Sequence, residues 1–143
     1  MVGKYFVGID VGGTKVYGGL VTPAGEILTV HKCPTPAGAG AKEIVGLIVK
    51  IVRALALEAD VPLKAVAGIG VAIPGIVDNK GKVVVTPNLK LGNVDLKGIL
   101  RKRFKCGIVV GNDVNLGVLG ERWLGAGRKA ENIVGVFPGT GIG

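Results

Sequence analysis

The fold is decided by residues 5–21, which read YFVGIDVGGTKVYGGLV. Two apolar runs flank the pair Gly12-Gly13, and a glycine pair between apolar runs is typical of a β-hairpin. A second turn, PAGE at 23–26, leads to a third apolar run at 27–32. The sequence therefore predicts three sequential antiparallel strands at the start of the chain.

The rest of the chain alternates helix and strand signals. Residues 41–59 contain no proline and carry apolar residues at helical spacing, which predicts a long helix. Asp95 is the expected N-cap of a shorter helix. The other expected elements are strands at 66–73, 108–111 and 133–137, a small hairpin at 76–77 and 82–86, and helices at 95–104 and from 112 or 113 to about 124. This order predicts an α/β fold whose mixed sheet begins with three antiparallel strands and has helices packed on it.

Composition limits the classes of function. Of the 143 residues, 48% are hydrophobic, so we expect a folded chain rather than a disordered one. The sequence has no serine and a single histidine, His31, which excludes a Ser-His-Asp hydrolase and a catalytic zinc site with two or three histidines. The net charge of +8 favours an anionic ligand. The densest basic run, residues 97–105, is interpreted as the charged end of a helix, so no nucleic-acid partner is expected.

The cysteines and the apolar segments indicate in which cellular compartment the protein is expected. Cys33 and Cys106 lie far apart and form no CxxC pair, which is typical of reduced thiols, with a long-range disulfide as the alternative. The N-terminus lacks the pattern of a signal peptide, and no stretch reaches the ~18 apolar residues that span a bilayer. We therefore expect a cytoplasmic protein with no membrane partner.

The first group of candidate site residues surrounds the glycine pair. Gly12 and Gly13 let backbone N–H groups approach an anion closely, while Thr14 adds a hydroxyl donor and Lys15 a cation. Asp10, at the end of the first strand, could hold Mg²⁺ through water. The combination indicates phosphate binding; the alternative is an ordinary hairpin turn.

The second group joins a strand to a helix. Residues 111–115 read GNDVN, and they follow the strand at its carboxyl end, where open α/β sheets bind ligands. Asp113 could accept a proton from a substrate hydroxyl, as a positioned carboxylate does in kinases. The alternative is that Asn112 or Asp113 only caps the helix.

Two further loops follow strands. Gly75 follows Pro74, and Asn88 lies in the stretch TPNL at 86–89. Their backbone and amide groups could contact a polyol, and plain turns are an equal alternative.

A second glycine loop ends the sequence. Gly139, Thr140 and Gly141 follow an apolar run, and two such loops in one chain are typical of two-lobed phosphotransferases that clasp the phosphates of a nucleotide. We expect residues 1–130 to form an N-terminal lobe and residues 131–143 to begin a truncated C-terminal lobe.

Together these stretches resemble the ROK family of repressors, open reading frames and sugar kinases. The matching stretches are residues 8–15, 70–75, 86–89, 112–115 with 120–121, and 139–143. The resemblance implies the ribonuclease-H-like lobe of an actin-like ATPase, the use of ATP with Mg²⁺, and phosphorylation of a hexose hydroxyl, foremost glucose to glucose 6-phosphate.

The resemblance also assigns roles to residues. It implies that Asp113 is the catalytic base and that Gly75, Asn88 and Asn112 contact the sugar together with Asp113. The ATP phosphates would be bound by the two glycine loops. A structural Zn²⁺ is expected only in a later part of the family's sequence that this chain lacks, and the full-length protein is expected to form a homo-oligomer.

Two other functions stay open at the level of sequence. One is a sugar-sensing transcriptional regulator of the same family that lacks its DNA-binding module; the start of the chain directly before the first strand favours the kinase. The other is a binding lobe without catalysis. We expect the chain alone to bind sugar weakly and to show no turnover, because one lobe cannot close a cleft and exclude water.

Overall fold

The computed structural model describes residues 4–138. Its strands are β1 (Tyr5–Val11), β2 (Lys15–Val21), β3 (Ile27–Pro34), β4 (Val66–Ile73), β5 (Ile76–Val77), β6 (Val83–Val85) and β7 (Gly107–Asn112). Its helices are α1 (Ala41–Glu58), the 3-10 helix η1 (Leu63–Ala65), α2 (Leu96–Arg101) and α3 (Asp113–Trp123).

The main sheet has five strands in the order β3-β2-β1-β4-β7. The first three strands pair antiparallel because short turns connect them, while β4 pairs parallel to β1 and β7 parallel to β4 after crossovers that contain helices. The prediction of a mixed sheet that starts with three antiparallel strands is therefore confirmed. A separate hairpin of β5 and β6 follows β4.

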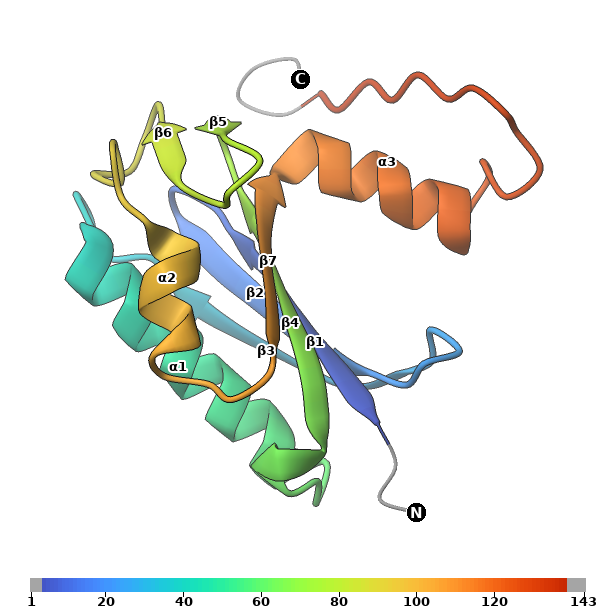
Figure 1. The fold of residues 1–143 in the computed structure, drawn as a ribbon, viewed down its shortest axis with the longest axis horizontal. Coiled ribbons are helices and arrows are strands. Elements are labelled where there is room, and N and C mark those ends of the chain that lie inside the picture. The colour runs from blue at the N-terminus through green and yellow to red at the C-terminus, as the bar shows by residue number, and fades with distance from the viewer. Residues whose placement is uncertain (1–3, 139–143) are drawn as a thin grey trace.

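The two faces of the sheet are covered differently (Figure 1). Helices α1 and α2 pack against one face, which we call the closed face, and α3 lies over the other, which we call the open face. The apolar side of α1 is fully buried on the closed face, including Ile44, Ile48 and Leu55. Gly18 permits this packing because a Cβ there would lie 2.3 Å from Cγ2 of Ile51.

Side chains cap both shorter helices. The carboxylate of Asp95 accepts a hydrogen bond of 2.9 Å from the backbone N–H of Gly98 at the start of α2, as the sequence predicts. The side-chain oxygen of Asn112 accepts one of 3.0 Å from the N–H of Asn115 at the start of α3. The capping interpretation of Asn112 is therefore confirmed.

The strand predicted at 133–137 is wrong. This segment belongs to neither sheet of the described residues, and Val134 is 91% exposed. Its apolar residues suit a strand, but a strand also needs the hydrogen-bonding edge of a neighbour, and no strand among residues 4–138 pairs with it. The segment instead runs back along α3, where the ring of Phe137 contacts Gly117. The lobe boundary near residue 130 stays a prediction.

Candidate active-site cleft

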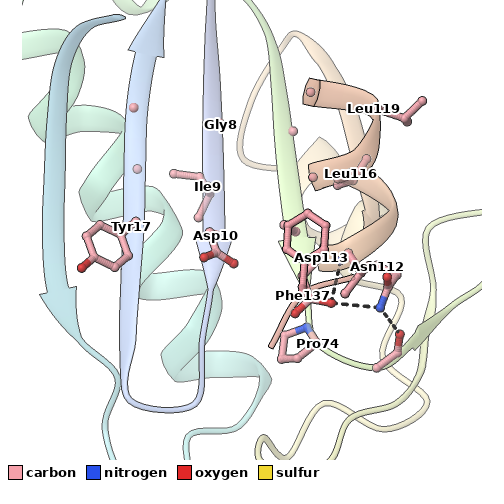
Figure 2. Close-up of a pocket in the computed structure, with 18 of the residues that line it drawn as sticks. Gly8, Ile9, Asp10, Tyr17, Pro74, Asn112, Asp113, Leu116, Leu119 and Phe137 are labelled. Atoms are coloured by element: carbon pink, nitrogen blue, oxygen red, sulfur yellow. Dashed lines mark hydrogen bonds between the residues drawn. The ribbon is translucent and has the colours of Figure 1, made fainter. Parts of the chain in front are cut away.

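A cleft of about 1160 Å³ opens on the open face of the sheet, between the carboxyl ends of β1 and β4 and helix α3 (Figure 2). It brings together side chains that lie far apart in the sequence. Five of the residues singled out in the sequence line it: Asp10, Gly75, Asn88, Asn112 and Asp113. Gly139, Thr140 and Gly141 lie outside the described residues.

Strand register explains why Asp10 and Asp113 face the same cleft. Asp10 on β1 pairs with Ala72 on β4, which pairs with Gly111 on β7. Since neighbouring strands lie roughly 4.8 Å apart, Asp10 and Gly111 are roughly 10 Å apart in one row. Asp113 begins α3 two residues later. The carboxyl ends of parallel strands therefore bring both carboxylates to one side of the sheet.

Asp113 is held by a small hydrogen-bond network that Figure 2 shows. Its Oδ1 accepts a bond of 2.9 Å from its neighbour's backbone, the N–H of Val114, and one of 3.0 Å from Nδ2 of Asn112. The same Nδ2 donates to the carbonyl oxygen of Gly75 at 2.9 Å. Oδ2 of Asp113 has no hydrogen-bond partner among residues 4–138, so it is available to a ligand.

This network gives Asn112 a positioning function. Its two amide hydrogens serve the Gly75 carbonyl and Asp113, and its oxygen caps α3. Sugar contact by its amide donors would require one of these bonds to be exchanged. By contrast, the side chain of Asn88 is exposed and makes no hydrogen bond with another described residue, so it is free to contact a ligand.

Gly75 is required by its backbone conformation. Its φ is +124°, and a Cβ there would lie 2.2 Å from the carbonyl oxygen of Val85. This conformation directs the Gly75 carbonyl toward Asn112. The glycine after Pro74 is therefore part of the support of Asp113.

The pKa of Asp10 is raised above 3.8, first by burial and then by the negative charge of Asp113; Lys15 opposes the shift. Two carboxylates that face one cleft favour a cation between or beside them. Residues 4–138 contain no group of three or more His, Cys, Asp or Glu side chains suited to a metal. Asp10 and Asp113 are of the donor type through which Mg²⁺ commonly binds, which is one or two carboxylates with water and phosphate oxygens.

The glycine loop between β1 and β2 lies at the rim of the cleft. None of Gly12, Gly13, Thr14 and Lys15 lines the cleft, but a Cβ at Gly13 would come within 3.1 Å of Cβ of Asn88, which does. The N–H of Gly12 donates to the carbonyl of Lys15 at 2.9 Å, and a Cβ at Gly12 would lie 2.9 Å from that same oxygen. A Cβ is therefore excluded at Gly12 and would press on the Asn88 side chain at Gly13.

Thr35 supports this loop, a role that no pattern in the sequence indicates. It is a buried polar residue, and its Oγ1 donates to the carbonyl of Gly12 at 2.7 Å. Its backbone N–H donates to the carbonyl of Thr14 at 3.0 Å. A threonine in a loop of small residues has no distinguishing pattern, so only the folded chain reveals the contact.

Comparison with known proteins agrees with this geometry. The family model described as "ROK family" matches residues 6–143. The chain belongs to the ROK family. The expected actin-like fold is confirmed, since the chain superposes with a TM-score of 0.86 on a ROK family glucokinase from Streptomyces griseus in complex with glucose and AMPPNP. That superposition has 33% identity and covers 97% of this chain and 43% of the glucokinase.

Relatives in the ROK family have two kinds of function. A glucokinase from Thermotoga maritima is 34% identical over 139 residues, which are 96% of this chain and 42% of the glucokinase. A xylose repressor from Caldicellulosiruptor bescii is 29% identical over 138 residues, which are 96% of this chain and 35% of the repressor. The chain thus spans less than half the length of these ROK relatives.

In the described part of the chain, 4–138, no helix is long and apolar enough to cross a membrane.

Proposed function

We propose that this ROK chain forms the N-terminal lobe of an ATP-dependent sugar kinase that phosphorylates a hexose hydroxyl, with glucose as the first candidate. The observation that carries the proposal is Asp113, a carboxylate fixed through Oδ1 with Oδ2 open to the cleft. Sugar kinases among the relatives support the same reading.

In this mechanism Asp113 accepts the proton of the attacking hydroxyl at Oδ2, since Oδ1 is already engaged. Asn112 holds the carboxylate through Nδ2, and Gly75 in turn holds the Asn112 amide. Asn88 offers a free amide for the other sugar hydroxyls. Phosphoryl transfer asks mainly for positioning and charge neutralisation, and this half of the cleft supplies the positioning.

The glycine loop would contact the phosphates of ATP through its backbone, with Lys15 supplying positive charge. When bound, Mg²⁺ neutralises charge on the transferred phosphoryl group, and Asp10 is the carboxylate that would hold it through water. Thr35 keeps the loop in place through the Gly12 and Thr14 carbonyls.

The test joins this lobe to the second lobe of the Thermotoga maritima glucokinase and measures ATP-dependent phosphorylation of glucose. Asp113→Asn should lower kcat by roughly 100-fold or more, with little change in the KM values, because shape is kept and the base is lost. The matched control is Asp60→Asn, an exposed aspartate just after α1 with φ of 53°, which asparagine adopts readily.

A second measurement separates the function of this site from the folding of the chimera. The 143-residue chain alone is therefore titrated with glucose by NMR, with expected shifts confined to Asn88, Asn112, Asp113 and their neighbours. Equal loss of kcat in both variants, or glucose shifts away from the cleft, would contradict the proposal.

A sugar-sensing regulator is the second candidate, since xylose repressors match the same residues. Such a protein would bind a sugar at this cleft without transferring phosphate. Sugar binding by a chimera with no turnover for glucose, mannose or xylose would favour the regulator.

A further inference from the structure

One short loop is hydrogen-bonded to two separate parts of the cleft. Residues 35–40, which read TPAGAG and which we call the connecting loop, join β3 to α1. At its start, Thr35 donates hydrogen bonds to two carbonyls of the glycine loop. At its end, the carbonyl of Ala39 accepts a hydrogen bond of 3.0 Å from the N–H of Lys90, and Gly40 forms a β-bridge with Lys90. The connecting loop therefore links two segments that are distant in the sequence.

The end at Lys90 belongs to the segment that would contact the sugar. Residues 86–90, which we call the Asn88 loop, are closed by a hydrogen bond from Oγ1 of Thr86 to the carbonyl of Leu89. This turn presents the exposed side chain of Asn88 at the cleft. The glycine loop lies close to it, since a Cβ at Gly13 would be 3.1 Å from Cβ of Asn88. A small shift of either loop would therefore change the spacing between them.

The connecting loop is anchored in the protein at both ends. Thr35 and Ala39 are buried, whereas residues 36–38 between them are exposed. Ala39 belongs to the same hydrophobic core as Leu89 of the Asn88 loop. Helix α1, whose apolar side is buried, begins directly after the connecting loop. The loop is thus fixed against the core and can hold its two partners at a set spacing.

Thr35 could instead serve only to complete the hairpin of β1 and β2. The turn of that hairpin is already closed by the hydrogen bond from the N–H of Gly12 to the carbonyl of Lys15. The backbone N–H of Thr35 adds a bond to the carbonyl of Thr14, which any residue but proline could make. The hydroxyl bond of 2.7 Å to the Gly12 carbonyl is additional, and it joins the glycine loop to the connecting loop rather than β1 to β2.

We propose that the connecting loop holds the glycine loop and the Asn88 loop as one unit, and that Thr35 is a positioning residue for phosphoryl transfer. The inference rests on the proposed kinase function, in which these two loops hold the phosphoryl donor and the acceptor sugar. Transfer needs donor and acceptor aligned at close distance, and a misplacement of about 1 Å can lower the rate by roughly 100-fold. Thr35 contacts neither ligand in this scheme and acts through the Gly12 carbonyl.

The link between the loops is tested first without a ligand, in the 143-residue chain. Thr35→Val keeps the shape of the side chain and removes the hydroxyl, so the N–H of Lys90 should exchange with solvent about threefold to tenfold faster, as measured by NMR. Thr35→Ser keeps the hydroxyl and should exchange like the unaltered chain. The matched control is Thr29→Val, which removes a threonine hydroxyl bonded to Glu58 and should leave exchange at Lys90 unchanged.

The positioning role is tested with the same variants in the chimera that carries the second lobe of the Thermotoga maritima glucokinase. Thr35→Val should lower kcat about tenfold and change the KM for glucose less than about twofold, because each loop keeps its own contacts while their spacing is altered. Thr35→Ser should keep kcat within about twofold, and Thr29→Val should leave kcat unchanged. A structural role alone would not give this split between kcat and KM.

A second variant keeps the test decisive if Thr35→Val folds poorly. Gly38→Ala strains the exposed middle of the connecting loop, where φ is +65°, without removing either bond, and it should change exchange and kcat in the same directions. Unchanged exchange at Lys90 would show that Thr35 supports only the hairpin, and unchanged kcat beside faster exchange would show that the spacing does not govern transfer. Either result would overturn the inference. Failure of the kinase proposal is distinguishable, since the unaltered chimera would then show no turnover; the positioning role would fall with it, while exchange at Lys90 would still decide the link.

Discussion

The closed and open faces of the sheet use glycine for opposite purposes. On the closed face, Gly18 lies against α1, and a Cβ there would come within 2.3 Å of Ile51 and 2.9 Å of Ile9. On the open face, Gly8 and Gly70 pair with each other, and a Cβ at either would meet nothing within 4 Å. The first glycine permits close packing and the other two leave surface free.

Exposure of apolar side chains follows the same division. Val7, Ile9 and Val11 of β1 are buried on the closed face, whereas Phe6 of the same strand is 38% exposed. Val109 on β7 is 58% exposed beside α3. The comparison teaches that stability and ligand binding are separated across the sheet: one face supplies the core, and the other keeps the cleft accessible.

The largest effect is expected from a substitution that disrupts the packing on the closed face. Gly18→Ala should destabilise the chain by about 3 kcal/mol, because the new methyl group overlaps packed side chains of α1 and β1. Gly8→Ala, on the same sheet but on the open face, should change the free energy of unfolding by less than about 0.5 kcal/mol. Urea unfolding of both variants measures the difference, and equal destabilisation would refute the distinction between the faces.

A smaller effect is expected at the rim of the cleft. Gly75→Ala should cost about 2 kcal/mol, because φ of +124° strains any residue with a Cβ and the Val85 carbonyl blocks the methyl group. The Asn112 bond to the Gly75 carbonyl should weaken with it, which faster amide exchange at the start of α3 would report. Gly70→Ala is the control, and unchanged exchange in Gly75→Ala would show that Gly75 does not support Asp113.

The smallest effect concerns the charge of Asp10. Its folded-state pKa is raised above 3.8 by burial and by Asp113, so the folded state holds the proton more tightly than the unfolded state does. Its contribution to stability is therefore present below about pH 4 and is lost as the pH rises through the raised pKa. The free energy of unfolding relative to Asp10→Asn should fall over that range by less than about 1 kcal/mol, since Asp10 is only half-buried.

Measuring the free energy of unfolding of the unaltered chain and of Asp10→Asn at several pH values, in low salt without divalent cations, tests the direction of this change. A difference that grows in favour of the unaltered chain with rising pH would mean that Lys15, rather than burial and Asp113, dominates the environment of Asp10.

Much of the fold follows from local patterns. The glycine pair, the turn at 23–26 and the helical spacing in 41–59 predicted β1, β2, β3 and α1 within a few residues, because each depends on contacts between near neighbours in the chain. Asp95 and Asn112 were recognisable as caps for the same reason. The residues that converge on the cleft were also identifiable, since ligand sites follow the carboxyl ends of parallel strands.

What the sequence by itself determined is therefore the order of elements and the residue types available for chemistry. Only the tertiary structure decided which glycine faces α1 and which faces the cleft, that Thr35 supports the glycine loop, and that the amide of Asn112 is engaged by Asp113. It also left 133–137 outside the sheet despite its strand-like composition. These features depend on contacts between residues distant in sequence, and a local pattern carries no information about which distant groups will meet.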